Sequence, residues 1–179
     1  MSTDRSTVTW CWYHCILGTY GAWLPGDDRG FRTRKHREHV EGDYKNPPPP
    51  GEFGSLKETA RQSLKQEPIA LGQAFRECVG KALRERLEGL GAIVVAVSVS
   101  SRHVHVLAKM PFDCPRQWVG LAKKHAWYEL RDRHQWNGKL WGKRGKYIPV
   151  RDREHQLRVY HYILEHAAHG AWIWKWGDD

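Results

Sequence analysis

Two histidines separated by one residue, His103 and His105, are the side chains of this sequence best suited to chemistry. They stand in the segment SRHVHVLAK, whose alternating pattern is typical of a β-strand. Because side chains on a strand alternate between its two faces, both imidazoles would point to one side while Val104 points into the core. Two neutral imidazoles so placed can share one divalent metal ion. The alternative interpretation is a pair of surface histidines on a half-exposed strand.

The residues after this pair narrow the kinds of metal site. A metallo-β-lactamase-type site would continue with Asp and His, whereas Val106, Leu107 and Ala108 follow here. A cupin-type site would have a glutamate shortly downstream, and the next one is Glu129. A complete (β/α)₈ barrel needs ~250 residues, more than the 179 of this chain. Any further ligand must therefore come from a distant element.

A second group of reactive side chains lies in the segment RVYHYILEH near the C-terminus. With a helical rotation of about 100° per residue, Leu157, Tyr160 and Leu164 share an apolar face, so we expect Tyr160 in the core. Tyr162 and His166 are four residues apart and therefore neighbours on the opposite face. A tyrosine beside a histidine and a basic residue is an unusually reactive set for a solvated surface. A merely solvated polar face is the alternative.

These features together resemble the single-tyrosine HUH transposases, which are the insertion-sequence-200-like enzymes and their REP-associated relatives. The resemblance rests on His103 and His105 after an apolar strand, on Tyr162 in a later helix, and on the early motif TYGAWLPGDDRG at residues 19–30. It spans about residues 8–170. One departure is the segment Leu164-Glu165-His166-Ala167, where many REP-associated relatives have an Asn-Asn-Pro-like segment.

The resemblance implies site-specific cleavage and rejoining of single-stranded DNA, usually beside a hairpin. It implies that His103 and His105 hold Mg²⁺ or Mn²⁺, that His166 supplies the third ligand, and that Tyr162 is the catalytic nucleophile. The implied fold is an RRM-like or ferredoxin-like α+β sandwich. Such a fold has a mostly antiparallel sheet with helices on one face, together with a C-terminal catalytic helix.

The hydrophobic pattern of the chain independently predicts an α+β sandwich. The predicted strands cover residues 8–19, 92–100, 101–109, 139–150 and 171–176, and the predicted helices cover 71–90, 115–133 and a last segment that begins after Asp152. We expect a single domain over residues 1–179, with a surface insertion near residues 42–55. The insertion contains NPPPPGEFG, which cannot form a helix or an inner strand because proline lacks the backbone donor.

The charge of the chain favours a polyanionic partner, with nucleic acid preferred over a membrane surface. Lys and Arg number 29 and Asp and Glu 20, which gives a net charge of +9. A basic but unspecific surface is the alternative. The expected phosphate contacts are Lys123, Lys124, Lys143, Arg144 and Lys146, with a second patch of Arg32, Arg34 and Lys35.

The remaining features of the sequence concern compartment and partners. No apolar run approaches the ~20 residues of a membrane span, and the four cysteines form no CxxC pair. We therefore expect a cytoplasmic, bacterial, nucleoid-associated protein with reduced thiols. The expected partner is single-stranded DNA with a hairpin, with no membrane partner, and a homodimer is left open. A relaxase or replication initiator is disfavoured by the short chain, and a non-catalytic nucleic-acid-binding module on the same fold is the rival function.

Overall fold

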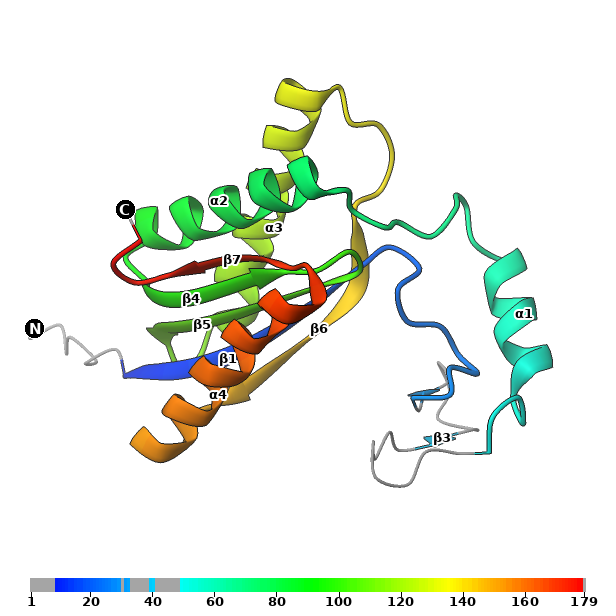
Figure 1. Cartoon of the computed structure of the whole chain (residues 1–179), viewed down its shortest axis with the longest axis horizontal. Coiled ribbons are helices and arrows are strands. Elements are labelled where there is room, and N and C mark those ends of the chain that lie inside the picture. Colours follow the sequence, from blue (N-terminus) through cyan, green and yellow to red (C-terminus); the bar gives the residue numbers. More distant parts are fainter. Residues whose placement is uncertain (1–8, 30, 33–38, 41–48, 179) are drawn as a thin grey trace, which may run out of the picture.

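The chain forms an antiparallel five-stranded sheet in the order β6-β1-β5-β4-β7 (Figure 1). The computed structural model describes residues 9–29, 31–32, 39–40 and 49–178. The strands of this sheet are β1 (Trp10–Thr19), β4 (Ile93–Val99), β5 (His103–Pro111), β6 (Trp141–Pro149) and β7 (Trp172–Lys175). The helices are α1 (Gly54–Gln62), α2 (Gln73–Gly89), α3 (Pro115–His134) and α4 (Arg153–Glu165), which runs into the 3₁₀ turn η1 (His166–His169).

Six of these elements follow one another as β1-α2-β4-β5-α3-β6, and their four strands pair in the order β6-β1-β5-β4. This is the ferredoxin-like βαββαβ arrangement. The prediction of an α+β sandwich with a mostly antiparallel sheet is confirmed, and the predicted strands and helices outside the region between β1 and α2 all form. The tail adds β7 to the free edge of β4, where it covers the exposed hydrogen-bonding groups of that strand.

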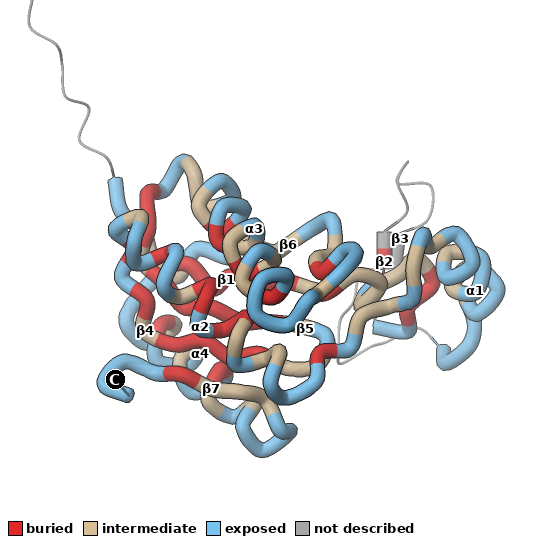
Figure 2. The backbone as a smooth tube through the Cα atoms, turned by 90° about the horizontal axis from the view of Figure 1, so that it is seen from above, coloured by how far each residue is buried: buried red, intermediate tan, exposed pale blue. Residues whose placement is uncertain are grey.

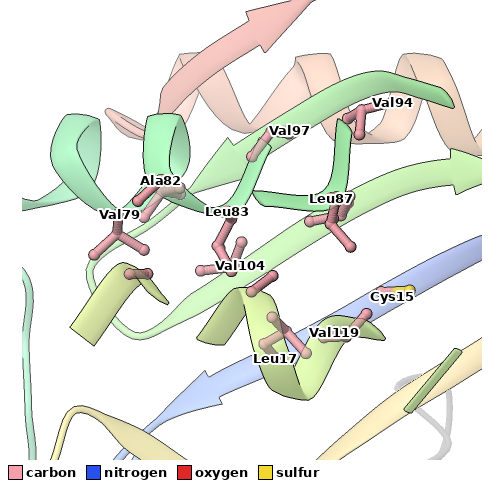
Figure 3. Packing of buried hydrophobic residues seen from close by; sticks show 14 of the residues in the cluster. Cys15, Leu17, Val79, Ala82, Leu83, Leu87, Val94, Val97, Val104 and Val119 are labelled. Carbon is pink, nitrogen blue, oxygen red and sulfur yellow. The ribbon is translucent and has the colours of Figure 1, made fainter. Parts of the chain in front are cut away.

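The main core lies between one face of the sheet and helices α2 and α3. Val79, Leu83 and Leu87 of α2 point toward the sheet, and Val104 of β5 meets them (Figure 3). Buried residues follow the central strands in Figure 2, whereas α1 carries none. The side chains that contact this core come from every second position of the central strands, so the alternate positions face the other side.

Helix α4 packs on that other side, against β4, β5 and β7. Asp152 caps its first turn by accepting a hydrogen bond from the His155 backbone N–H at 2.7 Å, as its residue type predicts. Val159 and Ile163 are buried against Ala96 and Leu107. Helices α2 and α3 therefore share one face of the sheet, and the C-terminal helix occupies the opposite one.

The expected apolar face of α4 was partly wrong. Tyr160 packs beside the small cluster as predicted, but Leu157 is 41% exposed, and Val159 and Ile163 are the residues that contact the sheet. Val159 comes two residues after Leu157, which is about 200° around the helix, so the face toward the sheet is rotated from the predicted one. The helical period groups residues into faces but does not say which face packs on the sheet.

The segment between β1 and α2 contains elements that the sequence did not predict. Strands β2 (Phe31–Arg32) and β3 (His39–Val40) form a two-stranded sheet, and α1 lies to one side of the main sandwich (Figure 1). Of the expected insertion, residues 42–48 lie outside the described residues, and 49–53 form a turn that leads into α1. Among the described residues, no helix combines the length and apolarity that crossing a membrane requires.

Candidate functional site: a histidine cluster beside Tyr162

Three histidines meet on the α4 side of the sheet. His103 and His105 lie two positions apart on β5, and Val104 between them is fully buried in the main core. His166 comes from the first residue of η1, directly after α4. One ring nitrogen from each of the three lies within 4.8 Å of the others. The structure therefore brings together the three predicted metal ligands from positions about 60 residues apart in the chain.

His166 is held in a defined orientation by a second contact. Its Nδ1 lies 2.8 Å from the backbone carbonyl oxygen of Tyr162, four residues earlier. A carbonyl can only accept, so Nδ1 bears a proton and Nε2 is the nitrogen left for a metal ion. A histidine that ligates a metal through one nitrogen and donates from the other is the usual arrangement in metal sites.

Burial lowers the pKa of both strand histidines of the cluster. Burial lowers the pKa of His105 far below its usual range, and the neighbouring His103, His14 and His166 lower it further. The pKa of His103 is also lowered, first by burial and then by the positive charges of His166 and Arg29. Neutral imidazoles are the form that binds metals, so these ligands would not need to lose a proton first.

Tyr162 stands at the open edge of the cluster. Its ring centroid lies 4.8 Å from that of His166 and 5.3 Å from that of His105, both in edge-to-face geometry. The side chain is 46% exposed, so a large substrate can reach it. Tyr160 instead packs beside Val159 and Ile163. Of the two tyrosines of α4, Tyr162 is the one that contacts the histidines.

Sequence reasoning missed a fourth histidine at this site. His14 is buried in the middle of β1, and its Nε2 lies 2.9 Å from Nδ1 of His105. Burial lowers the pKa of His14 to about 4, assisted by the positive charges of His155 and His166. A signal was present in the sequence, because a histidine within the apolar run VTWCWYHCILGT must find a hydrogen-bond partner when the strand is buried.

The early motif also comes near the cluster. Asp27 is buried and accepts two hydrogen bonds at 2.7 Å from the guanidinium of Arg29. The same guanidinium lies 4.4 Å from the ring of Trp23, and its charge is one cause of the lowered pKa of His103. Arg29, which the sequence analysis did not single out, is thereby fixed as a cation beside the histidines.

The structure distributes the predicted phosphate contacts over two sides of the sheet. On β6, Lys146 is exposed and lies on the His14 side, since it is opposite Ile16 of β1. Lys143 and Arg144 are also exposed and lie where the pairing of β6 with β1 shifts its register. On the other side of the sheet, α3 bears Lys123 and Lys124.

The remaining predicted phosphate contacts are Lys123 of α3 and the patch of Arg32, Arg34 and Lys35. Lys123 is half-buried and donates a hydrogen bond to the Gly142 carbonyl, which ties α3 to β6. Arg32 belongs to β2, while Arg34 and Lys35 lie outside the described residues.

The residues present fit a divalent metal ion. His105 and His166 each use Nδ1 in a hydrogen bond to a neighbouring residue. The Nε2 atom of each ring is therefore left to bind a shared metal ion. Ser98, directly opposite His105 on β4, has a buried hydroxyl with no hydrogen-bond partner among the described residues. Buried polar atoms are nearly always paired, so a water held by a metal ion at this cluster would account for it.

Comparisons with known proteins found similar structures but no matching family model and no curated protein. One solved structure is titled as that of a "putative transposase" from Deinococcus radiodurans: it is 14% identical, with a TM-score of 0.48, and the match covers 92% of this chain and 97% of that one. A REP-associated tyrosine transposase bound to a REP hairpin is 14% identical, with a TM-score of 0.42, and the match covers 95% and 75%.

Proposed function

We propose that this protein cleaves and rejoins single-stranded DNA through a covalent bond to Tyr162, as the HUH transposases that it resembles do. The observation that carries the proposal is the exposed phenol of Tyr162 at the edge of a three-histidine cluster, with ring centroids 4.8 Å and 5.3 Å from His166 and His105. A nucleophile and a set of metal ligands thus share one surface.

The ligand set suits a phosphodiester substrate. His103, His105 and His166 would hold a divalent ion, which, when bound, neutralises the phosphate and polarises the bond to be broken. An imidazole adds no charge of its own when it binds a metal, and no carboxylate joins this group among the described residues. The full positive charge of the site therefore remains available to an anionic substrate.

Tyr162 supplies the chemistry of a reversible cut. The Tyr162 phenol first loses its proton to solvent. The phenolate oxygen then attacks phosphorus, a Tyr–O–P bond forms as one phosphodiester P–O bond breaks, and the departing DNA alkoxide takes up a proton to become a hydroxyl. The phosphotyrosine ester conserves the energy of the broken bond, so a DNA hydroxyl can later attack it and restore the phenol. Rejoining then requires no nucleotide cofactor.

The proposed DNA path crosses the part of the sheet next to α4. Helix α4 packs on β4, β5 and β7, whereas Lys146 and Ile148 of β6 are exposed on the same side of the sheet, opposite Ile16 and His14 of β1. Arg144, which is also exposed, lies two residues before Lys146. Arg29 adds a fixed cation near His103. A basic surface with apolar side chains between the charges suits an unpaired strand, whose backbone is anionic and whose bases are apolar. A hairpin beside the cleaved strand is the partner that the family resemblance implies.

Covalent capture tests the proposal. The protein is incubated with Mn²⁺ and a library of single-stranded oligonucleotides that contain hairpins, and adducts that survive denaturation are recovered. Wild-type protein and Tyr160→Phe should form an adduct, and Tyr162→Phe should form none. Tyr160→Phe is a matched control, because it removes the same hydroxyl from the same helix.

Two further variants separate cleavage from binding. His103→Ala and His105→Ala should abolish the adduct and leave most DNA binding intact, because affinity comes mainly from many basic residues. An adduct that Tyr162→Phe still forms would refute Tyr162 as the nucleophile. Binding of the library by wild-type protein without any adduct would favour the non-catalytic binding module.

A further inference from the structure

The contact between His14 and His105 joins two neighbouring strands below the candidate metal site. His14 of β1 lies opposite Leu107 of β5, so its side chain reaches diagonally toward His105 on the same face. The two rings are 5.1 Å apart between centroids, and Nε2 of His14 is 2.9 Å from Nδ1 of His105. Their side chains are 7% and 3% exposed, so water does not compete for this hydrogen bond.

The ring nitrogens allow two arrangements of this hydrogen bond. A neutral imidazole has one N–H donor and one acceptor nitrogen. If His14 donates, Nδ1 of His105 accepts, and the proton of His105 must sit on Nε2, where it blocks metal binding. If His105 donates from Nδ1, its Nε2 keeps a lone pair. His166 already has this second pattern, because its Nδ1 can only donate to the Tyr162 carbonyl.

We propose that His14 is a positioning residue that accepts the Nδ1–H of His105 and holds the His105 ring with Nε2 turned toward the metal. This inference rests on the proposed metal site. His14 and the Tyr162 carbonyl would then have the same task, each on a different ligand. An apolar side chain would suit the centre of this strand equally well for packing, so the buried histidine is explained by its partner.

An imidazole that accepts the hydrogen bond from His105 differs chemically from the more common acceptor. Metal-bound histidines commonly donate to a carboxylate, which adds a negative charge beside the ion. His14 accepts without adding charge. The site would therefore retain more of the ion's positive charge for the phosphate, in agreement with a group of three histidines that no carboxylate joins among the described residues.

Metal affinity tests this role without any DNA. Mn²⁺ binding is measured by titration calorimetry on the full chain, with thermal unfolding as the check of folding. His14→Leu should weaken Mn²⁺ binding about tenfold to a hundredfold, which is the usual effect of removing the hydrogen-bond partner of a metal-binding histidine. His14→Gln should recover most of the affinity, because its amide oxygen can accept near the position of Nε2. His161→Leu, an exposed histidine of α4 that stacks on Tyr160, is the matched control and should bind as wild type.

A second measurement needs no variant. Long-range ¹H–¹⁵N spectra of the wild-type protein report which nitrogen of His105 bears the proton, and we expect Nδ1. A proton on Nε2 would overturn the inference, including in the case that His14→Leu does not fold.

The calorimetric outcomes are also distinguishable. Equal Mn²⁺ affinity in wild type and His14→Leu overturns the role of His14 and leaves the proposed function standing. Equal weakening in His14→Leu and His14→Gln shows that size and packing matter, not the acceptor, and also overturns it. Absence of Mn²⁺ binding by wild-type protein overturns the proposed metal site and this inference together.

Discussion

Gly80 in α2 should be intolerant of even one added carbon, although helices ordinarily prefer alanine to glycine. An ideal Cβ at this position would lie 2.0 Å from Cζ3 and 2.3 Å from Cε3 of Trp172, the first residue of β7. Carbon atoms pack at about 3.5–4.0 Å, so the indole ring of Trp172 must move. Gly80 therefore leaves room for the tryptophan that docks the C-terminal strand under α2.

The size of the effect follows from two opposing contributions. Replacing an interior helical glycine by alanine stabilises by about 0.5–1 kcal/mol. Overpacking a filled core costs about 1–3 kcal/mol, and full loss of a packed tryptophan costs about 3–5. Because Trp172 is half-buried, we expect Gly80→Ala to lower the free energy of unfolding by about 2 kcal/mol net. For a chain of this size that corresponds to a fall in Tm of about 4–8 °C.

Thermal unfolding of two glycine variants provides the assay. Gly120 is exposed in the interior of α3, and a Cβ there meets no atom within 4 Å. Gly120→Ala should therefore raise Tm by a few degrees, whereas Gly80→Ala lowers it. In the background of Trp172→Ala, Gly80→Ala should no longer destabilise, since the ring that it displaces is gone. If Gly80→Ala stabilises the wild-type protein as Gly120→Ala does, the packing of Trp172 against α2 is refuted.

Two further predictions concern ligands. An all-histidine ligand set suits transition metals better than Mg²⁺, which prefers oxygen ligands. The Kd for Mn²⁺, measured by calorimetry, should therefore be at least about tenfold lower than the Kd for Mg²⁺. Tighter binding of Mg²⁺ would point to other ligands. Replacing both Arg144 and Lys146 by Ala should reduce the slope of log K against log salt for single-stranded DNA by about 1.4, from about 0.7 per phosphate contact. Lys124→Ala, on the opposite side of the sheet, should leave that slope unchanged.

The parts of the site that follow from local periodicity could be predicted from the sequence. A strand repeats every two residues, so His103 and His105 had to share a face once β5 was recognised. A helix brings residues four apart together, so Tyr162 and His166 had to be neighbours. The structure adds that both pairs lie on the same side of the sheet, a relation that the sequence carried only through a family resemblance.

The parts that depend on contacts across the sheet could not be predicted in this way. His14 precedes His105 by 91 residues, and only the antiparallel register of β1 and β5 brings them together. The assignment of Lys146 to the His14 side requires knowing that it is opposite Ile16 of β1. A one-residue change of register would reverse these assignments, so a basic segment alone does not locate a DNA path.

The position of β7 links the stability of the fold to the geometry of the site. Only five residues separate the ring of His166 from the start of the strand at Trp172. The Ala171 backbone N–H donates to the His166 carbonyl, and Arg76 of α2 donates to the Gly170 carbonyl at 2.6 Å. His166, the third proposed metal ligand, is thus held from both sides, by α4 before it and by the docked strand after it. Undocking β7 should therefore loosen His166 while His103 and His105 stay fixed in β5, so the space at Gly80 contributes to the proposed metal site from the far side of the sheet.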